Sequence, residues 1–405
     1  MNVQVDAGQP IPHRPAMLDV FLKPTRDRSA RRRHPWVLSG AVDRVEGGEE
    51  PGAWARVVSA EGETLGFGHW SPESQIRVRF LAFGSEAPSE DLLAERITRA
   101  VARRAGDPLV GDTNAVRLVN SEGDELPGLV VDRYADMLVV RLSTAGMDAR
   151  RERVVDALRR ATGAAAAFER PDAQAARREG IAVHQGPLWG DPPKDAIAIT
   201  ERARCYRVDV GAGQKTGFYL DQRDARDLVQ SLASGRRVLD LFSYTGGFAV
   251  AAAHGGAQSI AVVESSAEAL EAAERHLEPW ALTTQLRFSR DDAFGFARRV
   301  PGPWDLIIVD PPPLARRSGD VDRAARAYKD LLLWTLKRAA PDALVLSFSC
   351  SHHIGPDLFR KIAFGASLDA ERPVQVLREL GAPADHPVAL DHPEGRYLTG
   401  LLLRA

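Results

Sequence analysis

The stretch VLDLFSYTGGFAV (residues 238–250) decides the fold of this 405-residue chain. A short apolar strand ends at Asp240, and a tight turn containing Gly246 and Gly247 opens a second apolar segment. Glycines let a backbone approach a ligand closely, and the helix that follows such a turn points its unpaired N–H groups at that ligand. The stretch therefore predicts a nucleotide-type cofactor site.

A second apolar strand, residues 259–263, ends in Glu264, eighteen residues after Gly246. In a βαβ unit this spacing places an acid where it can bind the hydroxyl pair of a ribose. The pattern is not G-x-G-x-x-G, and G-x-x-x-x-G-K-[ST] does not occur. A cofactor without a pyrophosphate is therefore favoured over NAD. An ordinary strand-to-helix turn would leave Asp240 and Glu264 unexplained.

Two later strands end in reactive side chains. WDLIIVDPPPLARR (residues 304–317) is an apolar strand that ends in Asp310 and is stopped by three prolines, which cannot donate to a sheet ladder. ALVLSFSCS (residues 343–351) is a second buried strand whose end carries Cys350. Ligands bind at the carboxyl edge of open α/β sheets, so we expect three acids and a thiol along one edge.

Composition sets the class of the protein. Apolar residues make up 44% and charged residues 27%, which is ordinary for a soluble globular chain of two or three domains. Cys205 and Cys350 cannot build a disulfide framework or a four-thiolate zinc site, so we expect a reducing, cytoplasmic setting. No signal peptide, membrane span or histidine pattern with metal-ligand spacing is visible, and neither a membrane nor a metal partner is predicted.

The formal net charge of −2 excludes a global positive field, but local charge is uneven. Residues 14–44 contain eight basic and three acidic side chains, with Arg31, Arg32 and Arg33 in a row. A charge cluster is usually a solvated face, so alone it favours nucleic acid only weakly.

Periodicity divides the chain into three parts. Residues 54–81 alternate apolar and polar side chains between turns, which predicts a small antiparallel sheet in a β-domain over residues 1–85. Residues 86–195 mix strands and helices in a central α+β domain. Residues 196–405 alternate strand and helix, which predicts an α/β, Rossmann-like doubly wound sheet.

Individual elements follow from the same patterns. In the central domain we expect helices at residues 90–104 and 149–161 and strands at 115–119, 128–132 and 138–142. The last strand, residues 397–403, is expected as an antiparallel edge. Cys205, inside CYRVDV, is expected in the core.

These residues resemble a known family. Asp240 with its glycine turn, Glu264, Asp292 and DPP at 310–312 are similar to the S-adenosylmethionine (SAM) motifs of Rossmann-like class I methyltransferases. GQKTGFYLDQR (213–223), FSCS (348–351), ADHPV (384–388) and PEGRYL (393–398) resemble the RlmI-type enzymes, which methylate cytosine C5 in large-subunit ribosomal RNA. RRRHPWVLSGAV (31–42) and WSPESQIRVR (70–79) resemble that family's PUA domain, and NSEGDELPGLVVDRY (120–134) its central EEHEE domain.

The resemblance implies SAM as cofactor and ribosomal RNA as partner, with a homodimer left open. It implies that Glu264 holds the ribose hydroxyls and Asp292 the adenine amine, while Gly246 and its turn approach the methionine part. Lys215, Phe218 and Tyr219 would close the pocket. The cofactor set implied in full is Lys215, Phe218, Tyr219, Asp240, Phe242, Tyr244, Gly246, Glu264, Ser265, Asp292, Ala293 and Asp310. Contacts with RNA are predicted for the basic residues Arg31, Arg32, Arg33, Arg316 and Arg317, unless they are solvated.

The resemblance also implies that Cys350 is the nucleophile and that Asp310 binds the target base. Cytosine C5 is a poor nucleophile, and addition of a thiolate to C6 turns the ring into an enamine. A neighbour must favour the thiolate, and Lys329, His352 and His353 are candidates. The two adjacent histidines are expected to point apart.

One departure bears on the acceptor. The family usually has DPPKF, whereas this chain has DPPPL at residues 310–314. Arg316 and Arg317 could replace the missing basic residue. A guanine nitrogen or a small metabolite as the methyl acceptor therefore stays open. The basic stretch over residues 14–44 also leaves open a non-catalytic RNA-binding assembly factor.

Overall fold

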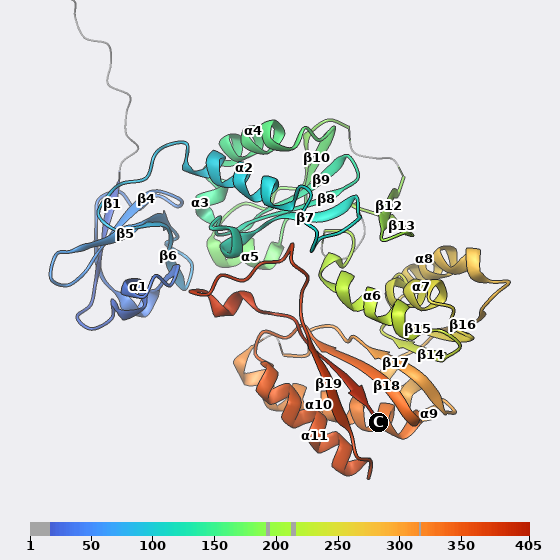
Figure 1. Cartoon of the computed structure of the whole chain (residues 1–405). Coiled ribbons are helices and arrows are strands. Elements are labelled where there is room, and N and C mark those ends of the chain that lie inside the picture. The colour runs from blue at the N-terminus through green and yellow to red at the C-terminus, as the bar shows by residue number, and fades with distance from the viewer. Residues whose placement is uncertain (1–16, 192–194, 212–215, 316) are drawn as a thin grey trace, which may run out of the picture.

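The computed structural model describes residues 17–191, 195–211, 216–315 and 317–405. Its strands form four sheets, and Figure 1 shows them as successive parts of the chain, from blue at the N-terminus to red at the C-terminus. Among the described residues, no helix combines the length and apolarity needed to cross a bilayer. Short 3-10 helices lie at Ser39–Ala41, Ser121–Asp124, Leu220–Gln222, Glu278–Trp280, Ser318–Asp320 and Pro393–Gly395.

The N-terminal part is a six-stranded sheet in the order β2-β6-β5-β4-β1-β3. Its elements are β1 (Leu18–Leu22), α1 (Arg28–Arg31), β2 (Trp36–Leu38), β3 (Val42–Glu46), β4 (Trp54–Val58), β5 (Thr64–Trp70) and β6 (Ile76–Phe83). The antiparallel sheet expected over residues 54–81 is confirmed by β4, β5 and β6. β1 adds a parallel pairing to β4, which the alternation does not reveal.

The central part is a five-stranded sheet in the order β11-β10-β9-β8-β7. Its elements are α2 (Leu92–Arg104), β7 (Ala115–Asn120), β8 (Leu129–Tyr134), β9 (Met137–Leu142), α3 (Ala145–Asp148), α4 (Arg151–Thr162), β10 (Ala166–Glu169), α5 (Ala173–Glu179) and β11 (Gly186–Trp189). The predicted strands and both predicted helices are confirmed to within two residues at most ends. α2 packs through Leu93, Ile97 and Ala100, spaced as one helical stripe requires.

β12 (Ile197–Glu201) and β13 (Arg204–Val208) form a two-stranded hairpin. Side chains alternate along β13, so Tyr206 is buried while Cys205 points outward and is exposed. The expectation that Cys205 lies in the core is therefore wrong. Its position within the period-two pattern, which depends on the register with β12, decides its exposure.

The C-terminal part is a seven-stranded sheet in the order β16-β15-β14-β17-β18-β20-β19. Its elements are α6 (Arg223–Leu232), β14 (Arg237–Leu241), α7 (Gly247–His254), β15 (Ser259–Glu264), α8 (Ala267–Leu277), β16 (Gln285–Arg290), α9 (Ala293–Arg299), β17 (Trp304–Val309), α10 (Val321–Arg338), β18 (Ala339–Ser349), α11 (Pro356–Asp369), β19 (Gln375–Leu380) and β20 (Thr399–Arg404).

β14 to β18 pair in parallel, and β20 is antiparallel to both β18 and β19. The expectation that the last strand is an edge is wrong: β20 inserts between β18 and β19, and β19 is the edge. β20 is apolar and buried along most of its length, which suits an internal strand.

Helices cover both faces of this sheet, which confirms the doubly wound fold. Side chains of α6, α7 and α8 share one core with Val238 and Ile308, whereas those of α9, α10 and α11 share a second core with Leu239 and Ile307. Neighbouring strand residues thus point into different cores. This explains why the strands are continuously apolar.

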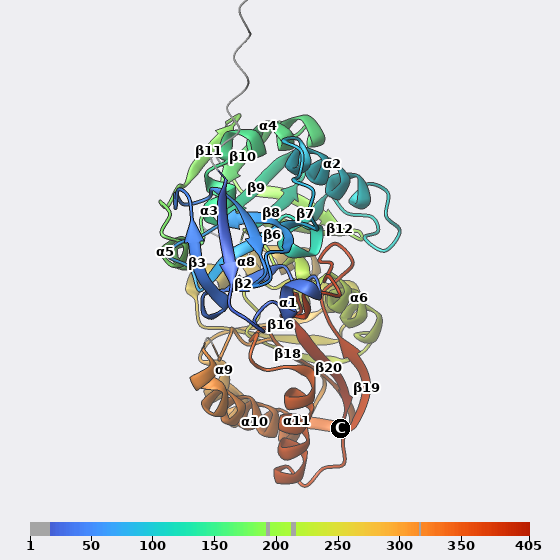
Figure 2. The ribbon, with the colours of Figure 1, turned by 90° about the vertical axis from the view of Figure 1, so that its left-hand side faces the viewer.

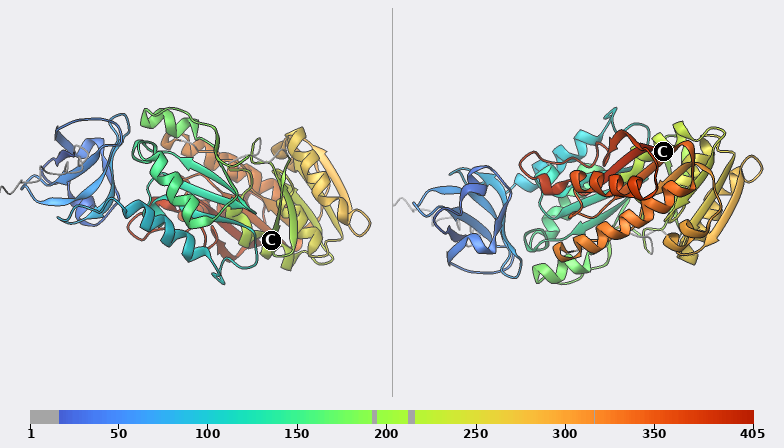
Figure 3. Two further views of the ribbon diagram at one scale, coloured as in Figure 1. Left: turned by 90° about the horizontal axis from the view of Figure 1, so that it is seen from above. Right: turned by 90° about the horizontal axis from the view of Figure 1, so that it is seen from below.

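The connection between β19 and β20, residues 381–398, reaches out of its own sheet. A ring nitrogen of His34 lies 3.1 Å from the Glu394 carboxylate, and Asn120 Nδ2 donates to the Pro387 carbonyl at 3.0 Å. Figure 2 shows the red connection beside the blue N-terminal part, and Figure 3 places that part at one end of the molecule.

Candidate active site

A cavity of about 380 Å³ lies at the carboxyl ends of β14, β15, β17 and β18. This is the edge at which the sequence predicts a ligand. Nine of the predicted residues line it: Phe218, Tyr219, Phe242, Tyr244, Glu264, Ser265, Asp292, Asp310 and Cys350. Among the described residues, no group of three or more His, Cys, Asp or Glu side chains could hold a metal ion.

The turn between β14 and α7 shapes one wall of the cavity. Gly246 has φ +81°, and a Cβ there would lie 3.0 Å from the Ala273 Cβ, so glycine is required by both backbone and packing. Phe242 and Tyr244 also have positive φ, at 60° and 50°. Strained backbone of this kind gathers at ligand sites. Gly246 does not itself line the cavity, and its role is to let its neighbours do so.

Asp240 stabilises this turn through a buried hydrogen bond. It is fully buried and does not line the cavity, although the resemblance implies a cofactor contact. Its Oδ2 accepts a hydrogen bond from the Ser243 hydroxyl at 2.5 Å, and Ser243 does line the cavity. Burial raises the pKa of Asp240 to about 7.

Glu264 ends β15, and its carboxylate faces the cavity. One oxygen accepts from the Tyr244 N–H at 2.9 Å, and the other accepts from the Ser266 N–H at 2.9 Å. These bonds fix the orientation of the carboxylate. Each carboxylate oxygen has two lone pairs, so Glu264 can still accept from a hydroxyl of a ligand.

Asp292 caps the N-terminus of α9, where its Oδ2 accepts from the Gly295 N–H at 2.7 Å. Ala293 is buried beside it and does not line the cavity, whereas Phe294 does. The Phe294 ring meets Phe242 edge to face, with centroids 5.6 Å apart. This end of the cavity thus combines a carboxylate with an aromatic wall.

The segment that precedes α6 covers the cavity from the other side. Phe218 and Tyr219 both line it, and the Tyr219 ring meets Tyr244 edge to face at 5.5 Å. Burial raises the pKa of Tyr219 above its usual value. Lys215, predicted to help close the pocket, lies outside the described residues.

Asp310 and Cys350 follow directly after the adjacent strands β17 and β18. Both line the cavity, so the thiol and the carboxylate predicted to meet do share one site. The Cys350 Sγ–H donates to the Pro311 carbonyl at 3.6 Å, and the side chain is partly exposed. Pro311 and Pro312 line the cavity as well.

Ser351 anchors the loop that departs from the DPPKF pattern. Its Oγ accepts from the Leu314 N–H at 3.0 Å and from the Ala315 N–H at 3.1 Å. The loop after Asp310 is therefore held against the end of β18. Arg317 is exposed, and Arg316 lies outside the described residues.

The proposed thiol neighbours lie elsewhere. Lys329 pairs with Asp369 at 2.8 Å, and neither His352 nor His353 lines the cavity. The two histidine rings meet edge to face with centroids 5.5 Å apart, so the expectation that they point apart is wrong. A turn follows β18, and this geometry brings consecutive side chains together.

The sequence predicts no role for three further residues that line the cavity. Asp221 and Gln222 lie in the quoted LDQR motif, and Arg226 lies one turn into α6. Asp221 accepts from the Tyr397 hydroxyl at 2.7 Å. The resemblance of GQKTGFYLDQR (213–223) to the family motif was the signal in the sequence that could have identified Asp221 and Gln222.

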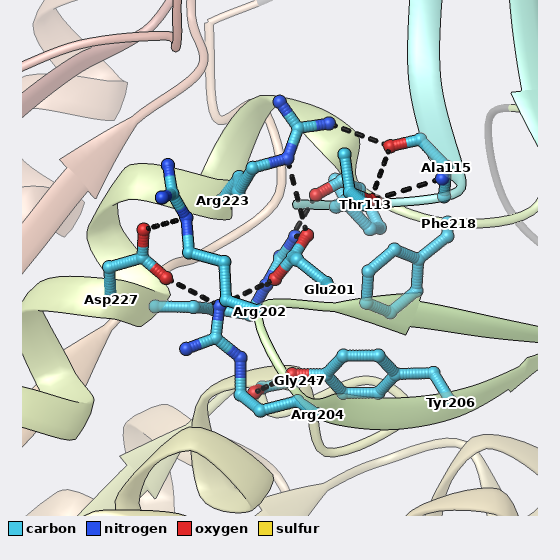
Figure 4. A network of polar contacts seen from close by, with 12 residues as sticks. Thr113, Ala115, Glu201, Arg202, Arg204, Tyr206, Phe218, Arg223, Asp227 and Gly247 are labelled. Atoms are coloured by element: carbon cyan, nitrogen blue, oxygen red, sulfur yellow. Dashed lines mark hydrogen bonds and ion pairs between the residues drawn. The ribbon is translucent and has the colours of Figure 1, made fainter. Parts of the chain in front are cut away.

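Arg226 belongs to a buried ionic network, which Figure 4 shows around Glu201. Its guanidinium binds both Glu201 oxygens, at 2.7 and 2.6 Å, and donates to the Tyr219 carbonyl at 2.9 Å. Arg204 and Arg223 approach the same carboxylate at 3.0 and 3.7 Å. Nothing in the sequence links Glu201 to this site, because the tertiary fold alone brings it there.

The basic stretch of the N-terminal part does not line the cavity. Arg31 pairs with Asp27 at 2.5 Å and with Glu63 at 2.6 Å, and Arg33 lies over the Phe83 ring at 5.2 Å. Arg32 is exposed. Their contact with RNA stays a prediction.

The arrangement fits SAM. Two oriented carboxylates, Glu264 and Asp292, follow neighbouring strands, and the turn at Gly246 allows close approach of a ligand. An aromatic pair, Phe242 and Phe294, offers a surface for a flat ring. Carboxylate oxygens accept from hydroxyl and amine groups such as those of a ribose and an adenine, and aromatic rings pack against a purine face.

Comparison with known proteins agrees. A family model described as S-adenosylmethionine-dependent methyltransferase matches residues 132–387, and one described as a PUA-like domain matches residues 20–83. Ribosomal RNA large subunit methyltransferase I of Erwinia tasmaniensis is 38% identical over 390 residues, covering 95% of this chain and 98% of the relative. The protein of that name from Serratia proteamaculans is 40% identical over 399 residues, with 95% and 98% covered.

Two solved structures share the fold. A methyltransferase complexed with SAH has a TM-score of 0.82 at 22% identity and covers 96% of this chain and all of its own. A SAM-dependent methyltransferase from Streptococcus mutans has a TM-score of 0.80 at 22% identity, with the same coverage. Together with the cavity, these findings show that the chain belongs to the family of ribosomal RNA large subunit methyltransferase I, whose members use SAM as cofactor.

Proposed function

We propose that this protein methylates C5 of a cytosine in large-subunit ribosomal RNA, with Cys350 as the nucleophile. The observation that carries the proposal is that Cys350 and Asp310 line the same cavity as Glu264 and Asp292, to which we assign the ribose and the adenine amine of SAM. The name of the relatives, ribosomal RNA large subunit methyltransferase I, supports the RNA substrate.

The chemistry needs a thiolate at this place. Cys350 gives its proton to a base, its sulfur bonds to C6, and the electron pair of the C5–C6 double bond moves towards C5, which becomes nucleophilic. SAM supplies an electrophilic methyl group when it is bound. After C5 has been methylated, its proton leaves to a base, the C6–S bond breaks and the thiolate is regenerated.

The contacts of Cys350 and Asp310 suit these roles. The Pro311 carbonyl holds the thiol at the rim of the cavity, where a partly exposed sulfur can meet a base. When Asp310 carries a proton, it can donate to N3 of that base, and a preorganised donor there stabilises the negative charge that addition of the thiolate places on the ring. The base must leave its stack, which costs a few kcal/mol in a paired stem and less in a loop.

We further propose a division of labour along the chain. Residues 1–85 dock RNA, with Arg31, Arg32 and Arg33 as phosphate contacts, and residues 86–195 set the distance to the catalytic part, residues 196–405. The match of a PUA-like model to residues 20–83 supports the first assignment.

The test is the substitution Cys350→Ala. We expect methyl transfer to unmodified large-subunit rRNA to be lost, because no other group in the proposal adds to C6. SAM affinity measured by calorimetry should be retained. Cys205→Ala is the matched control, since Cys205 is exposed on β13 and does not line the cavity. Full activity of Cys350→Ala would exclude the thiol mechanism.

Nucleoside mass spectrometry of the product identifies the acceptor. We expect 5-methylcytidine. An N-methylguanosine product, or transfer to a small metabolite alone, would instead favour the acceptors that the DPPPL departure leaves open.

A further inference from the structure

Gln222 is a buried amide beside the proposed reaction centre. It ends the 3-10 helix Leu220–Gln222, is 2% exposed and lines the cavity. Its Nε2 donates to Asp310 Oδ2 at 3.0 Å. Its Oε1 is buried and has no hydrogen-bond partner among the residues that the structure describes. A buried acceptor left unsatisfied is unfavourable, so such an atom beside a ligand cavity points to a donor on the ligand.

Asp310 fixes the orientation of the Gln222 amide, and therefore which of its ends is available to a ligand. A carboxylate accepts hydrogen bonds, so the NH₂ end of Gln222 must face it. A flipped amide would set Oε1 against Oδ2, and two acceptors would repel each other. The end that can take a ligand contact is therefore the carbonyl, which only accepts.

The residues on both sides hold Gln222 in place. Asp221 binds the Tyr397 hydroxyl at 2.7 Å, and Arg223 binds Asp385 at 3.0 Å and the Ala115 carbonyl at 2.8 Å. Arg223 is fully buried. The neighbours of residue 222 are thus anchored to two other segments, the connection between β19 and β20 and strand β7, and the bond to Asp310 holds the amide itself.

We propose that Gln222 determines the base specificity of the site by accepting a hydrogen bond from the 4-amino group of the target cytosine through Oε1. The proposal rests on the proposed function. Cytosine carries a donor at this position, whereas uracil carries the acceptor O4. With uracil the two oxygens would face each other and Oε1 would stay unsatisfied. A site built around a hydrogen bond rejects an analogue that lacks it far more strongly than an apolar site does.

The experiment removes the 4-amino group of the target cytosine and the amide of Gln222 in separate steps. Mass spectrometry first maps the modified nucleotide in large-subunit rRNA. Short RNAs with that site are then made with cytidine or with 2-pyrimidinone riboside, which is cytidine without its 4-amino group. Dissociation constants are measured in the Cys350→Ala background with SAH present, so that no covalent adduct forms.

With Gln222 in place we expect the cytidine RNA to bind about ten-fold more tightly than the 2-pyrimidinone RNA. Adding Gln222→Met, which keeps the volume and removes both hydrogen bonds, should reduce this ratio to about two-fold or less. Gln222→Asn, which withdraws the oxygen by one methylene, should reduce it as well. The proposed contact of Asp310 is with N3, which both RNAs carry, so an effect on Asp310 cancels in the ratio.

An unchanged Tm and an unchanged circular dichroism spectrum show that the variants are folded, and Asn serves if Met does not fold. A ratio that stays near ten in a folded variant, or one near unity before Gln222 is changed, would overturn the role of Gln222 while the product remains 5-methylcytidine. A mapped base other than cytosine would overturn the proposed function and this inference together.

Discussion

Two arginine-rich regions of this molecule differ in almost everything except composition. The first, Arg31 to Arg33, lies on the surface, where the Arg31 side chain is 41% exposed and its partner Glu63 58%. The second, around Glu201, has arginines that are buried almost completely, with Arg226 only 2% exposed. Consecutive arginines are conspicuous in a sequence. Arginines that meet only in the fold are not.

Burial, rather than charge density, decides how strongly the loss of one partner of an ion pair affects stability. Solvent screens the Arg31 pairs, and such pairs contribute little to stability. Around Glu201 every charge must find a partner, because an unpaired buried charge is costly. The buried cluster also touches the active site, since Arg226 donates to the Tyr219 carbonyl.

The largest expected effect comes from breaking the buried cluster. Glu201→Gln leaves the charges of Arg204, Arg223 and Arg226 without their shared carboxylate, and we expect a loss of about 3–5 kcal/mol in the free energy of unfolding. Urea denaturation followed by circular dichroism measures it.

The matched control is Glu63→Gln, which removes a partner of the exposed Arg31. We expect no measurable loss of stability. Equal losses in the two variants would contradict the contrast between the regions.

The second-largest effect is expected from acid, which should weaken the ion pairs of the buried cluster. Burial acts to raise the pKa of the Glu201 carboxyl, but the surrounding arginines, Arg226 above all, outweigh it and lower this pKa from 4.5 to about 2. The unfolded chain binds the proton more readily, so the stabilisation is complete above about pH 4.5 and is lost as the pH falls towards 2. We expect Tm to fall less steeply over this range in Glu201→Gln than in the unaltered protein. Parallel curves would show that Glu201 does not cause the acid sensitivity.

A smaller effect should reach the cofactor through Arg226. Arg226→Lys keeps the charge but loses the two-pronged contact with Glu201 and the bond to Tyr219, because lysine lacks the planar fork of donors. We expect about ten-fold weaker SAM binding by calorimetry. Arg204→Lys is the control, since Arg204 joins the same cluster without lining the cavity. Equal weakening by both would mean that the cluster acts only through overall stability.

The smallest effect is expected at the surface. If Arg32 contacts a phosphate, Arg32→Ala should weaken rRNA binding a few-fold and reduce the slope of log affinity against log salt by about 1. Filter binding at several salt concentrations measures this. An unchanged slope would leave the basic stretch as a solvated face.

Much of the catalytic site follows from sequence because its residues stand at strand ends. Apolar runs stopped by glycine or proline place Glu264, Asp310 and Cys350 at one sheet edge, whatever the rest of the chain does. The same reasoning misplaced Cys205, because its exposure depends on pairing between β12 and β13. It also assigned Asp240 to the cofactor, although burial makes it a support for the turn.

The class of fold and the set of side chains at the carboxyl edge follow from the amino-acid sequence, since periodicity and strand punctuation are local properties, and SAM as the cofactor follows from the resemblance of its motifs to a family. Three features became known only from the three-dimensional fold. β20 lies between β18 and β19, Glu201 lies among three arginines, and the Gln222 amide contacts Asp310. These are contacts between segments far apart in the chain. Their energies come from burial and pairing, which no local pattern of residues records.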